Sequence, residues 1–434
     1  MFERNTMPQN DENVPRTKLS LLKLTTLNMY WYGLSFLWNT IHPLVLPAIL
    51  LKYVPETSKN TYLGLLTFLG LILAMLIQPI AGAGSDHFSS RWGKRKPFIA
   101  LGTLLDVLVL IGIAYSRSLV GIFIGYIALQ ISSNIAHGPM QGLIPDLVPD
   151  QQKGLASGIK NFMDVFGLIT ASLLAGKLFA PDNTNFLPIF LAVIAFLLIT
   201  ALITLFTTNE AVCKGEQRAA RESFSIRQVF TVDLKAHRAF GNLILSRFIF
   251  LLGVYGIQTF AQYYIIDVMA VENAVQATGE MMAAIAVALI VCALISGWLT
   301  DKVGPLKLMN LSMVITALGG VGLFFVRDMQ TLTLLAGVIG GGMGFYLTTN
   351  WTLAVRLAPP DQAGKFMGLT NIATAGASAI GRLEGPLIDF ANRIQPGMFL
   401  GYKLMFLFCF ACSLISLILF NVFIKKEKKI STSL

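Results

Sequence analysis

Charged residues are scarce in this sequence: they make up 13% of its 434 residues, while 55% are apolar. Soluble domains average about 25% charged residues, so the composition excludes an ordinary cytosolic enzyme. The net charge of +10 could indicate a nucleic-acid-binding protein, but the basic residues fall in short segments between long apolar spans. That placement is typical of a membrane protein, so we expect a lipid bilayer around the chain and no nucleic acid as partner.

Histidine and cysteine are also rare, with four of each. Cys213 lies in a polar segment and the other three cysteines lie in apolar spans, which argues against a disulfide framework. No histidine stands near Cys409 or Cys412, so this pair does not resemble a zinc site. The sequence shows no nucleotide-binding motif and no plausible catalytic triad. We therefore predict no enzyme, no metal site and no cofactor, and residues 1–18 lack the apolar core of a cleavable signal peptide.

Long apolar runs dominate the rest of the chain. About 20 apolar residues cross a bilayer core as a helix, and lipid offers the backbone no hydrogen-bond partners, so spans of this length must be helical. The sequence predicts an all-α membrane protein of twelve transmembrane helices in two pseudo-symmetric six-helix bundles. The glycine run Gly337–Gly344 lies inside one span and predicts close helix packing or a bend. The predicted spans are 24–51, 61–84, 97–116, 119–144, 154–179, 186–207, 239–267, 278–299, 305–326, 331–355, 364–390 and 399–424.

Lysine and arginine are distributed unevenly between the two sets of loops. The set on the side of the termini holds most of them, whereas the other set holds few, among them Lys52, Lys59, Arg117, Arg327 and Arg393. The positive-inside rule therefore predicts cytoplasmic termini and a multi-pass protein of a bacterial-type plasma membrane. The longest polar stretch divides the spans six and six. The predicted parts are an N-terminal tail 1–23, a bundle 24–207, a linker 208–238 with a short amphipathic helix around 223–232, a bundle 239–424 and a basic tail 425–434.

The most informative polar segment is the basic hairpin Gly82–Phe98, GAGSDHFSSRWGKRKPF, between the second and third spans. A weaker copy, GWLTDKVGPLK at Gly297–Lys307, follows the eighth span, and its Asp301 lies 215 residues after Asp86 (301 − 86). A Pro-Asp pair ending at Asp150 precedes the fifth span and recurs before the eleventh, 211 residues later (361 − 150). Two motifs with nearly equal spacing indicate a duplicated chain.

These features resemble the major facilitator superfamily over essentially the whole chain. The first hairpin has three extra residues between Asp86 and the basic run, a form similar to the glycoside–cation symporters and the related sucrose-transporter branch. The resemblance implies two bundles that rock about a central site and open alternately to each side. The chain lacks the acids that those symporters carry on helices one, two or four. It also lacks the Arg on helix four and the Gly-Pro pair on helix five that are typical of proton-driven drug exporters.

The resemblance further implies that the hairpins gate the transporter. Asp86 is expected near the N-terminus of helix eleven, where a carboxylate is stabilised by free N–H groups and the helix dipole. Arg91 and Arg95 are expected to pair with acids at the far end of helix four. A hydrated ion pair contributes about 1 kcal/mol or less, which lets a latch open; alternatively, the basic run only sets the topology. The predicted gating residues are Gly82, Asp86, Arg91, Gly93, Arg95, Asp146, Asp150, Asp301 and Lys302.

Polar side chains on the first, fourth, seventh and tenth helices, which line the cavity in this superfamily, are predicted to bind substrate. Asn39 and His42 are three residues apart and so share one helical face. Amides hydrogen-bond hydroxyl groups and aromatic rings cover the apolar faces of sugars, so a neutral polyol fits. The alternative is that these groups cross-link helices. The predicted binding residues are Asn39, His42, Asn134, His137, Gln141, Gln258, Gln262, Tyr263, Asn350 and Trp351.

Ionisable residues at membrane depth are functional candidates because burying them costs several kilocalories per mole. Lys160 and Asp164 are four residues apart and can pair, either as a structural pair or as part of the mechanism. Asp106 is expected to make a structural hydrogen bond, and Arg247 to reach the cytoplasmic interface. Arg382, two residues before Glu384, is expected to need a partner elsewhere. The predicted proton carriers are Asp164, Glu384, His42 and His137.

The sequence therefore predicts a monomeric secondary transporter that works by rocker-switch alternating access. Its predicted cargo is a small neutral polar solute, a sugar or glycoside, moved by symport with protons across the cytoplasmic membrane. One alternative is an exporter of amphipathic compounds or drugs, favoured by the many phenylalanines. Another is a non-transporting sensor or assembly factor with the same fold, because a fold does not settle a function.

Overall fold

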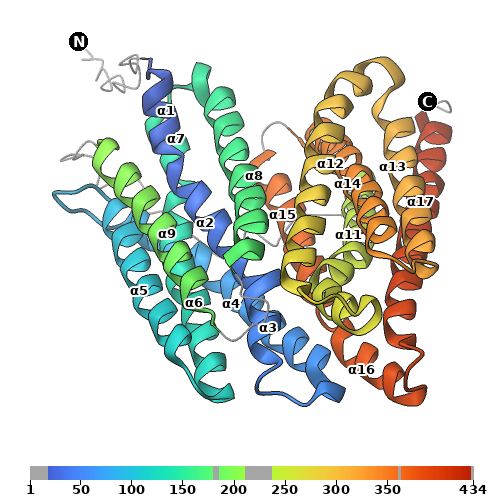
Figure 1. The fold of residues 1–434 in the computed structure, drawn as a ribbon. Helices are drawn as coiled ribbons and strands as arrows, with labels where there is room; N and C mark the ends of the chain where they lie inside the picture. The colour runs from blue at the N-terminus through green and yellow to red at the C-terminus, as the bar shows by residue number, and fades with distance from the viewer. Residues whose placement is uncertain (1–17, 179–184, 211–236, 360–362, 432–434) are drawn as a thin grey trace, which may run out of the picture.

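The computed structural model describes residues 18–178, 185–210, 237–359 and 363–431, without the side chains of residues 301, 363–365 and 423–431. Figure 1 shows two groups of helices, which we name the N-terminal bundle and the C-terminal bundle. The N-terminal bundle contains α1 (Leu21–Leu27), α2 (Met29–Thr40), α3 (Leu46–Leu50), α4 (Lys59–Asp86), α5 (Lys96–Tyr115), α6 (Leu119–Gln141), α7 (Leu143–Leu147), α8 (Lys153–Leu178) and α9 (Leu187–Thr207). The C-terminal bundle contains α11 (Arg238–Tyr264), α12 (Ala274–Val303), α13 (Pro305–Phe324), α14 (Met329–Leu357), α15 (Ala363–Gly381), α16 (Glu384–Ile394) and α17 (Leu400–Ser431).

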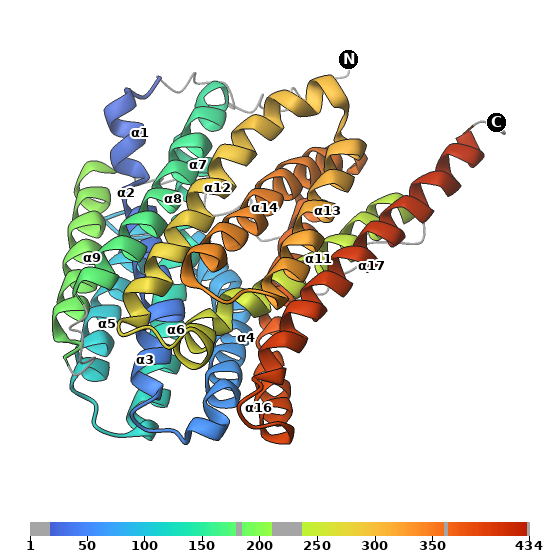
Figure 2. The ribbon, with the colours of Figure 1, turned by 45° about the vertical axis from the view of Figure 1, so that its right-hand side comes forward.

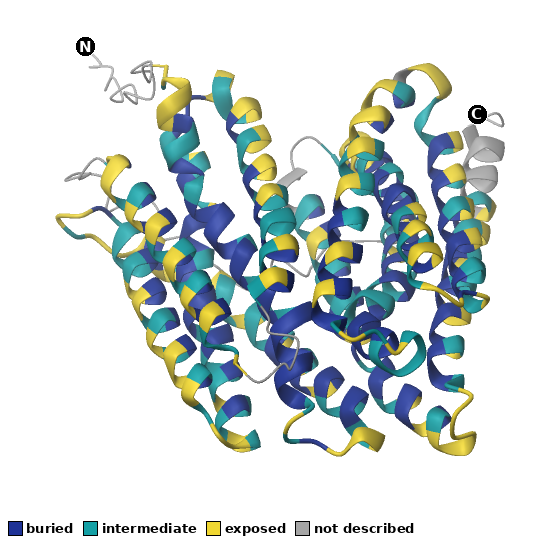
Figure 3. Cartoon of the chain, in the orientation of Figure 1, coloured by how far each residue is buried: buried dark blue, intermediate teal, exposed yellow. Residues whose placement is uncertain are grey.

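The all-α membrane architecture predicted from the sequence is confirmed. Eleven helical spans in the described part of the chain are long and apolar enough to cross a bilayer. Helices on the outside of the molecule, such as α5 and α9, carry exposed faces in Figure 3. Large apolar side chains lie on these faces; Leu108 and Phe206, for example, are 57% and 81% exposed. Lipid tails would cover such side chains, so this surface is a membrane belt and not an aggregation site.

Four helices of the described part begin with a side-chain cap, and at the start of α1 this cap is Ser20, which accepts from the backbone N–H of Lys23 at 3.3 Å. Ser118, Asn273 and Asp328 accept hydrogen bonds from the backbone N–H groups of Gly121, Gln276 and Thr331 at the starts of α6, α12 and α14. Such residues satisfy N–H groups that have no partner within the first turn. The backbone N–H and the hydroxyl of Thr331 also lower the pKa of Asp328 below its usual value.

The first helix of each bundle contains a π-helical turn. Ile41–Val45 joins α2 to α3, and Ile265–Met269 follows α11. The two turns therefore occupy matching places in the two halves, which the sequence did not indicate. A π-helical turn is rare and is found frequently at functional sites. Here one turn carries His42 and the other carries Asp267.

The predicted eleventh span, 364–390, is not one continuous helix. It is built from α15 and α16, and the helix breaks at Arg382 and Leu383. At the break, the N–H of Leu383 donates to Ile380 O at 2.9 Å and that of Gly385 to Arg382 O at 3.3 Å, which are turn-type bonds. The last helix, α17, continues to Ser431, past its predicted end at 424.

The glycine run in α14 packs against a neighbouring helix, which confirms the packing alternative of the prediction. A Cβ added at Gly344 would lie 2.2 Å from Leu289 O of α12, and one added at Gly340 would lie 2.6 Å from Ile285 O. Both distances are shorter than any van der Waals contact. Only glycine lets the backbones of α12 and α14 approach this closely.

The two bundles meet on one side of the molecule. In Figures 1 and 2 the start of α1 and the end of α17 lie at the same end, which we name the terminal side, and the ribbons of the bundles diverge toward it in Figure 1. The other end, the opposite side, is where the end of α8 packs against the start of α12. There a Cβ added at Gly279 would lie 2.2 Å from Ser172 O, and one at Gly176 would lie 2.9 Å from the Cα of Gln276.

Candidate functional site

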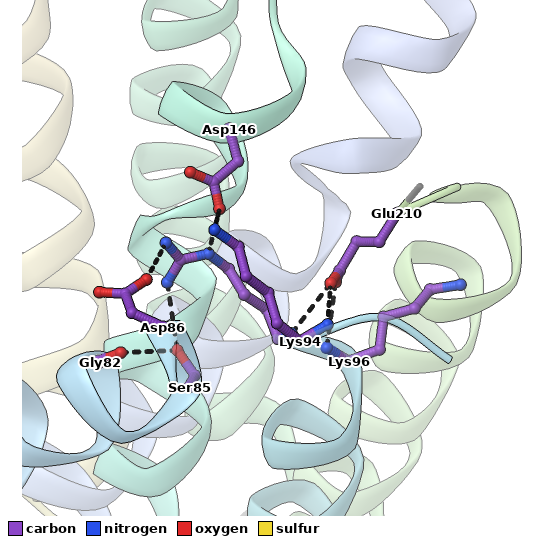
Figure 4. A network of polar contacts seen from close by, with 8 residues as sticks. Gly82, Ser85, Asp86, Lys94, Lys96, Asp146 and Glu210 are labelled. Atoms are coloured by element: carbon purple, nitrogen blue, oxygen red, sulfur yellow. Dashed lines mark hydrogen bonds and ion pairs between the residues drawn. The ribbon is translucent and has the colours of Figure 1, made fainter. Parts of the chain in front are cut away.

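The basic hairpin on the terminal side is held together by Arg95 (Figure 4). Its Nε donates to Asp146 at 2.6 Å, and its terminal nitrogens donate to Asp86 at 2.7 Å and to Ser85 at 3.2 Å. Lys94 adds a second ion pair to Asp146, at 2.9 Å. The predicted pairing of Arg95 with the end of helix four is therefore present. Because Asp86 is bonded to Arg95, the hairpin ties α4, α5 and α7 into one unit within the N-terminal bundle.

Glu210 completes the hairpin from a distant part of the sequence. Its carboxylate accepts hydrogen bonds from three successive backbone N–H groups, those of Lys94 at 2.6 Å, Arg95 at 2.9 Å and Lys96 at 3.1 Å. The start of α5 has no side-chain cap of its own, so Glu210 supplies one. A carboxylate at a helix start is stabilised by the helix dipole. Glu210 was not among the predicted residues because it lies in the predicted linker, where no periodic pattern marks it.

The other predicted gating residues vary in their surroundings. Gly93 has a φ of +102°, which favours glycine, and a Cβ added there would lie 2.3 Å from Glu210 Oε2. Arg91 is exposed, and Asp150 forms an ion pair with Lys153 at 2.5 Å. The ammonium of Lys302 lies over the ring of Trp298 in its own helix, 3.8 Å from the centroid. Gly82 faces Gly138 of α6. The side chain of Asp301 and the start of helix eleven near residues 360–362 lie outside the described part, as does the predicted linker helix.

A polar cluster links the first and fourth helices of the N-terminal bundle. His42 Nε2 lies 2.9 Å from the hydroxyl of Tyr126 and 3.2 Å from Gln130 Nε2, and Gln130 donates to Tyr126 at 2.7 Å. The ring of Trp38 lies 4.7 Å from that of His42. Tyr126 and Gln130 are buried, at 1% and 2% exposed, whereas His42 and Trp38 are partly exposed, so the cluster sets hydrogen-bonding groups beside an aromatic face. Tyr126 and Gln130 were not among the predicted residues, although they lie four apart on one face of α6.

The remaining predicted residues of this bundle make local contacts. The amide nitrogens of Asn39 and Asn134 donate to the carbonyl oxygens of Ser35 and Gln130 at 2.8 Å in each case, four residues back along their helices. Their amides therefore cap helix carbonyls. The imidazole of His137 packs edge-on against Trp31, with ring centroids 5.1 Å apart, and its Nε2 has no hydrogen-bond partner in the described structure. Gln141 is exposed.

The predicted pair of Lys160 and Asp164 is formed on α8. Lys160 Nζ lies 2.5 Å from Asp164 Oδ2, and the two side chains are 28% and 32% exposed. The same ammonium lies 4.3 Å from the ring of Trp31, and the backbone carbonyl of Asp164 accepts a hydrogen bond from Ser35. The pair thus joins α8 to α2 while keeping partial access to solvent. Asp106, by contrast, is fully buried and accepts a hydrogen bond from Ser132, which is the structural bond expected for it.

Arg247 does not reach the interface as predicted. Its side chain is 6% exposed; Nε donates to Thr374 at 2.9 Å and a terminal nitrogen donates to Asn350 at 2.7 Å. Neutral oxygens from α14 and α15 thus hold the guanidinium inside the C-terminal bundle, so it gains nothing by extending outward. Asn350 uses its amide oxygen for this bond, its buried Nδ2 has no partner in the described structure, and Trp351 beside it is 44% exposed.

The break between α15 and α16 brings Arg382 and Glu384 into the protein interior. Each side chain is 8% exposed. A terminal nitrogen of Arg382 donates to the carbonyl oxygen of Ser378 at 2.5 Å and to its hydroxyl at 2.8 Å, but Nε has no partner in the described structure. Neither carboxylate oxygen of Glu384 has a hydrogen-bond partner there either. Glu384 lies against Gly256, where an added Cβ would be 2.2 Å from Oε2.

A buried polar network joins the two bundles on the opposite side; we name it the opposite-side latch. Lys59 at the start of α4 pairs with Asp267 of the second π-helical turn, and Tyr402 of α17 donates to the same carboxylate at 2.7 Å. The second half of the latch is Asp389 of α16. It accepts hydrogen bonds from the Asn60 amide at 2.8 Å and from the backbone and hydroxyl of Thr61 at 2.7 and 2.6 Å.

Burial makes the latch different from a surface ion pair. The side chains of Lys59, Asn60 and Asp389 are 2%, 1% and 3% exposed. A buried pair of this kind is costly to separate unless water or another group replaces it. Lys59 and Asp267 lie 208 positions apart, so the sequence alone gave no indication of the pair.

Two residues predicted to bind substrate belong to this interface instead. The hydroxyl of Tyr263 donates to Pro47 O at 3.1 Å. When the Gln262 amide is oriented so that both its oxygen and its nitrogen find hydrogen-bond partners, the nitrogen donates to Pro43 O at 2.9 Å and to Leu44 O at 3.0 Å. The three accepting carbonyls lie in or just after the first π-helical turn. These bonds close the opposite side between α11 and α3.

A small apolar cavity of about 90 Å³ is lined mainly by the C-terminal bundle and is bounded on one side by Leu168 of α8. Gln258 and Tyr264 are the polar residues of its described lining, and four methionines lie in its wall. Methionine is flexible and polarisable, so a wall of this kind adapts to different ligands. The four methionines, on α12, α14 and α17, are Met281, Met282, Met343 and Met405.

The fold and the paired hairpins define a class of membrane transporter, and a comparison of sequences gives the family. The model of the Major Facilitator Superfamily matches residues 26–381. The chain belongs to this superfamily, and it is a multi-pass integral membrane protein and a transporter.

Similar proteins differ in their named cargo. Multidrug resistance protein MdtG of Citrobacter koseri is 26% identical over 377 residues, which cover 84% of this chain and 87% of that protein. A bacterial homologue of the human lysosomal transporter Spinster, in an inward-facing and unoccupied conformation, has a TM-score of 0.74 at 16% identity, covering 93% and 97% of the two chains. The nucleoside transporter NupG has a TM-score of 0.69 at 15% identity, covering 94% and 99%. These relatives support the superfamily, whereas the finer resemblance to sugar symporters gains no support from them.

Proposed function

We propose that this protein exports amphipathic organic compounds from the cytoplasm by rocker-switch alternating access. The observation that carries the proposal is the methionine wall of the apolar cavity between the C-terminal bundle and Leu168 of α8. Adaptable apolar surfaces bind compounds that share size and hydrophobicity rather than one hydrogen-bonding pattern. The similarity to a protein named for multidrug resistance supports the same class of cargo.

In this proposal the termini are cytoplasmic, and the opposite side faces outward. The opposite-side latch is then an outer gate in its closed position, and the structure corresponds to a state that opens toward the cytoplasm. The hairpin around Arg95 keeps the N-terminal bundle rigid during the rocking motion. The side chain of Asp86 in this hairpin is 51% exposed. It can therefore contact the C-terminal bundle when the inner side closes.

Asp164 is the proposed proton carrier among the four candidates. A proton carrier must reach water in at least one state, and the side chain of Asp164 is 32% exposed. Protonation of its carboxylate would release Lys160 from the ion pair and change the charge beside Trp31. Glu384 is far less accessible, at 8% exposed, and His137 packs against Trp31. In this proposal, bound cargo and a proton on Asp164 exclude each other, so protons and cargo cross the membrane in opposite directions.

A sugar is the second candidate cargo, and the cluster of His42, Tyr126 and Gln130 beside Trp38 favours it. This cluster combines hydroxyl-binding groups with an aromatic face, which suits a pyranose ring. The predicted amides of Asn39 and Asn134 do not contribute, because they are bonded to their own helices.

Reconstitution into liposomes tests the proposal. Efflux of a neutral, a cationic and an anionic fluorescent amphiphile is compared with uptake of labelled sucrose and lactose, each with and without a pH gradient. We expect amphiphile flux that the gradient accelerates, and reduced flux when Met343→Trp fills the cavity. The matched control is Met398→Trp, at a methionine that is 56% exposed between α16 and α17. Sugar uptake without amphiphile flux would establish the second candidate, and no flux of any probe would favour the non-transporting alternative.

A further inference from the structure

Two arginines lie inside the C-terminal bundle without an acidic partner in the described part of the chain. Arg247 is held by the neutral oxygens of Asn350 and Thr374. Arg382 uses one terminal nitrogen for Ser378, and its Nε is unpartnered. Both side chains are more than nine-tenths buried. Of the two, Arg382 therefore has the larger unused capacity to donate hydrogen bonds.

The surrounding charges do not neutralise this pair of arginines. The other buried cations of the described part of the chain, Lys59 and Arg95, each have an aspartate partner. Glu384 is two residues from Arg382 but makes no ion pair with it, and its carboxylate turns instead toward Gly256. An uncompensated buried charge costs several kilocalories per mole. Such a charge persists in a membrane protein when a function needs it.

Arg382 is placed where the two bundles face each other. It lies at the break between α15 and α16, and its backbone carbonyl is 2.2 Å from the position of a Cβ added at Gly64 of α4. Six residues further along α4, a Cβ added at Gly70 would lie 2.5 Å from the ring of Tyr126. Gly381, the residue before Arg382, faces α11, where an added Cβ would lie 3.6 Å from the Cβ of Tyr255. In transporters, interrupted helices commonly form the binding site at the centre of the membrane.

The geometry points to a cargo that carries an anionic group, a carboxylate, sulfonate or phosphonate, bound at Arg382 between the bundles. The planar guanidinium can offer Nε and a terminal nitrogen to two oxygens of one anion. The hydroxyl of Tyr126 can donate from the other bundle by turning away from His42. The apolar part of the cargo would extend along α11, where Gln258 lies three residues from Tyr255 and lines the methionine cavity. This inference rests on the proposed export of amphipathic compounds and specifies their charge.

Three probes with one fluorophore separate charge from hydrophobicity. They are dansyl-6-aminohexanoate, which is anionic, its methyl ester, which is neutral, and dansylcadaverine, which is cationic. Transport of each is measured in proteoliposomes, and binding to the full-length protein in detergent is measured by dansyl fluorescence. For the wild-type protein we expect the carboxylate to bind at least about tenfold more tightly than the ester, since a charge-assisted bidentate pair contributes about 1.5–3 kcal/mol. This comparison needs no variant.

Variants then assign the preference to Arg382. In Arg382→Gln we expect the carboxylate to lose its tenfold advantage, while the ester is still bound and transported; Arg382→Lys keeps part of the advantage because it keeps the charge. Arg356→Gln, at an exposed arginine near the end of α14, is the matched control and should keep the full preference. Ester flux and the thermal unfolding midpoint show whether each variant is folded.

Two results would overturn the inference while leaving the export function intact. One is a wild-type protein that transports the ester or the amine as well as the carboxylate. The other is a carboxylate preference that survives in Arg382→Gln. Failure of the wild-type protein to bind or transport any of the three probes would instead contradict the proposed export function itself.

Discussion

Replacing Lys59 by alanine should shift the protein toward a conformation that is open on the opposite side. Lys59 is 2% exposed and pairs with Asp267, which is held in addition by Tyr402. In Lys59→Ala, Asp267 would keep the Tyr402 bond but would be buried without a counter-charge. Opening of the opposite side would bring this carboxylate into water. The variant therefore destabilises the closed state much more than the open one.

The structure sets the size of the shift. Removing one partner of a buried ion pair costs about 3–5 kcal/mol, whereas the same pair exposed to solvent contributes about 1 kcal/mol at most. The difference between the two conformations is then about 2–4 kcal/mol, or about 30- to 700-fold in their equilibrium. The matched control is Glu56→Gln. Glu56 also contacts Lys59, at 3.9 Å, but is 85% exposed, so its loss should change the equilibrium by less than about fivefold.

Distances between spin labels measure this equilibrium. In a cysteine-free background, one pair of labels at Lys153 and Arg356 reports on the terminal side, and a second pair at Arg117 and Arg327 reports on the opposite side. We expect Lys59→Ala to shorten the first distance and lengthen the second in most molecules, whereas Glu56→Gln resembles the wild type. The reasoning is refuted if Lys59→Ala moves neither distance distribution further than Glu56→Gln does.

Three further predictions concern the proton site, the hairpin and the helix packing. Asp164→Asn should keep downhill flux of a neutral amphiphile but lose its acceleration by a pH gradient, because the amide cannot carry a proton; flux in proteoliposomes at two gradients measures this. Glu210→Gln should lower the stability of the N-terminal bundle by about 1–2 kcal/mol through its weaker cap on α5, seen as a lower thermal unfolding midpoint in detergent. Gly344→Val should cost about 1–3 kcal/mol, because its side chain would collide with Leu289 O of α12.

Matched variants show whether these effects are specific. Glu280→Gln, at an exposed acid of α12, should leave the response to the pH gradient unchanged. Gly337→Val lies in the same helix as Gly344 but has no atom within 4 Å of the added Cβ, so its midpoint should stay near that of the wild type. Equal losses at Gly337 and Gly344 would contradict the packing argument. An unchanged gradient response in Asp164→Asn would remove Asp164 as proton carrier.

Short-range features of the structure followed from the sequence. The pair of Lys160 and Asp164 was predictable because residues four apart on a helix are neighbours. Arg95 and Asp146 were predictable as partners because both stand at ends of adjacent helices on the same side of the membrane. The packing of Gly344 was predictable because a glycine run inside an apolar span allows two helix backbones to approach closely.

Features that depend on contacts between distant residues did not follow. Gln262 and Tyr263 have the polarity of binding residues, but a π-helical turn in the partner helix offers them carbonyl oxygens instead. Arg247 was expected to extend outward because the sequence did not show that Asn350 and Thr374 would meet it. Helical periodicity placed Arg382 and Glu384 on a continuous helix, and the break between α15 and α16 changes the direction of both.

Opening of the opposite-side latch requires water to bind to the groups that the latch pairs in the closed state. When the latch opens, Asp267, Asp389 and Asn60 and the carbonyls of the first π-helical turn lose partners that only water can replace. Each opening event therefore takes up a set of water molecules. The open state should consequently be sensitive to osmotic pressure: a large excluded solute outside the membrane, which lowers the activity of water, should favour the closed latch and slow the transport cycle without touching the cargo site.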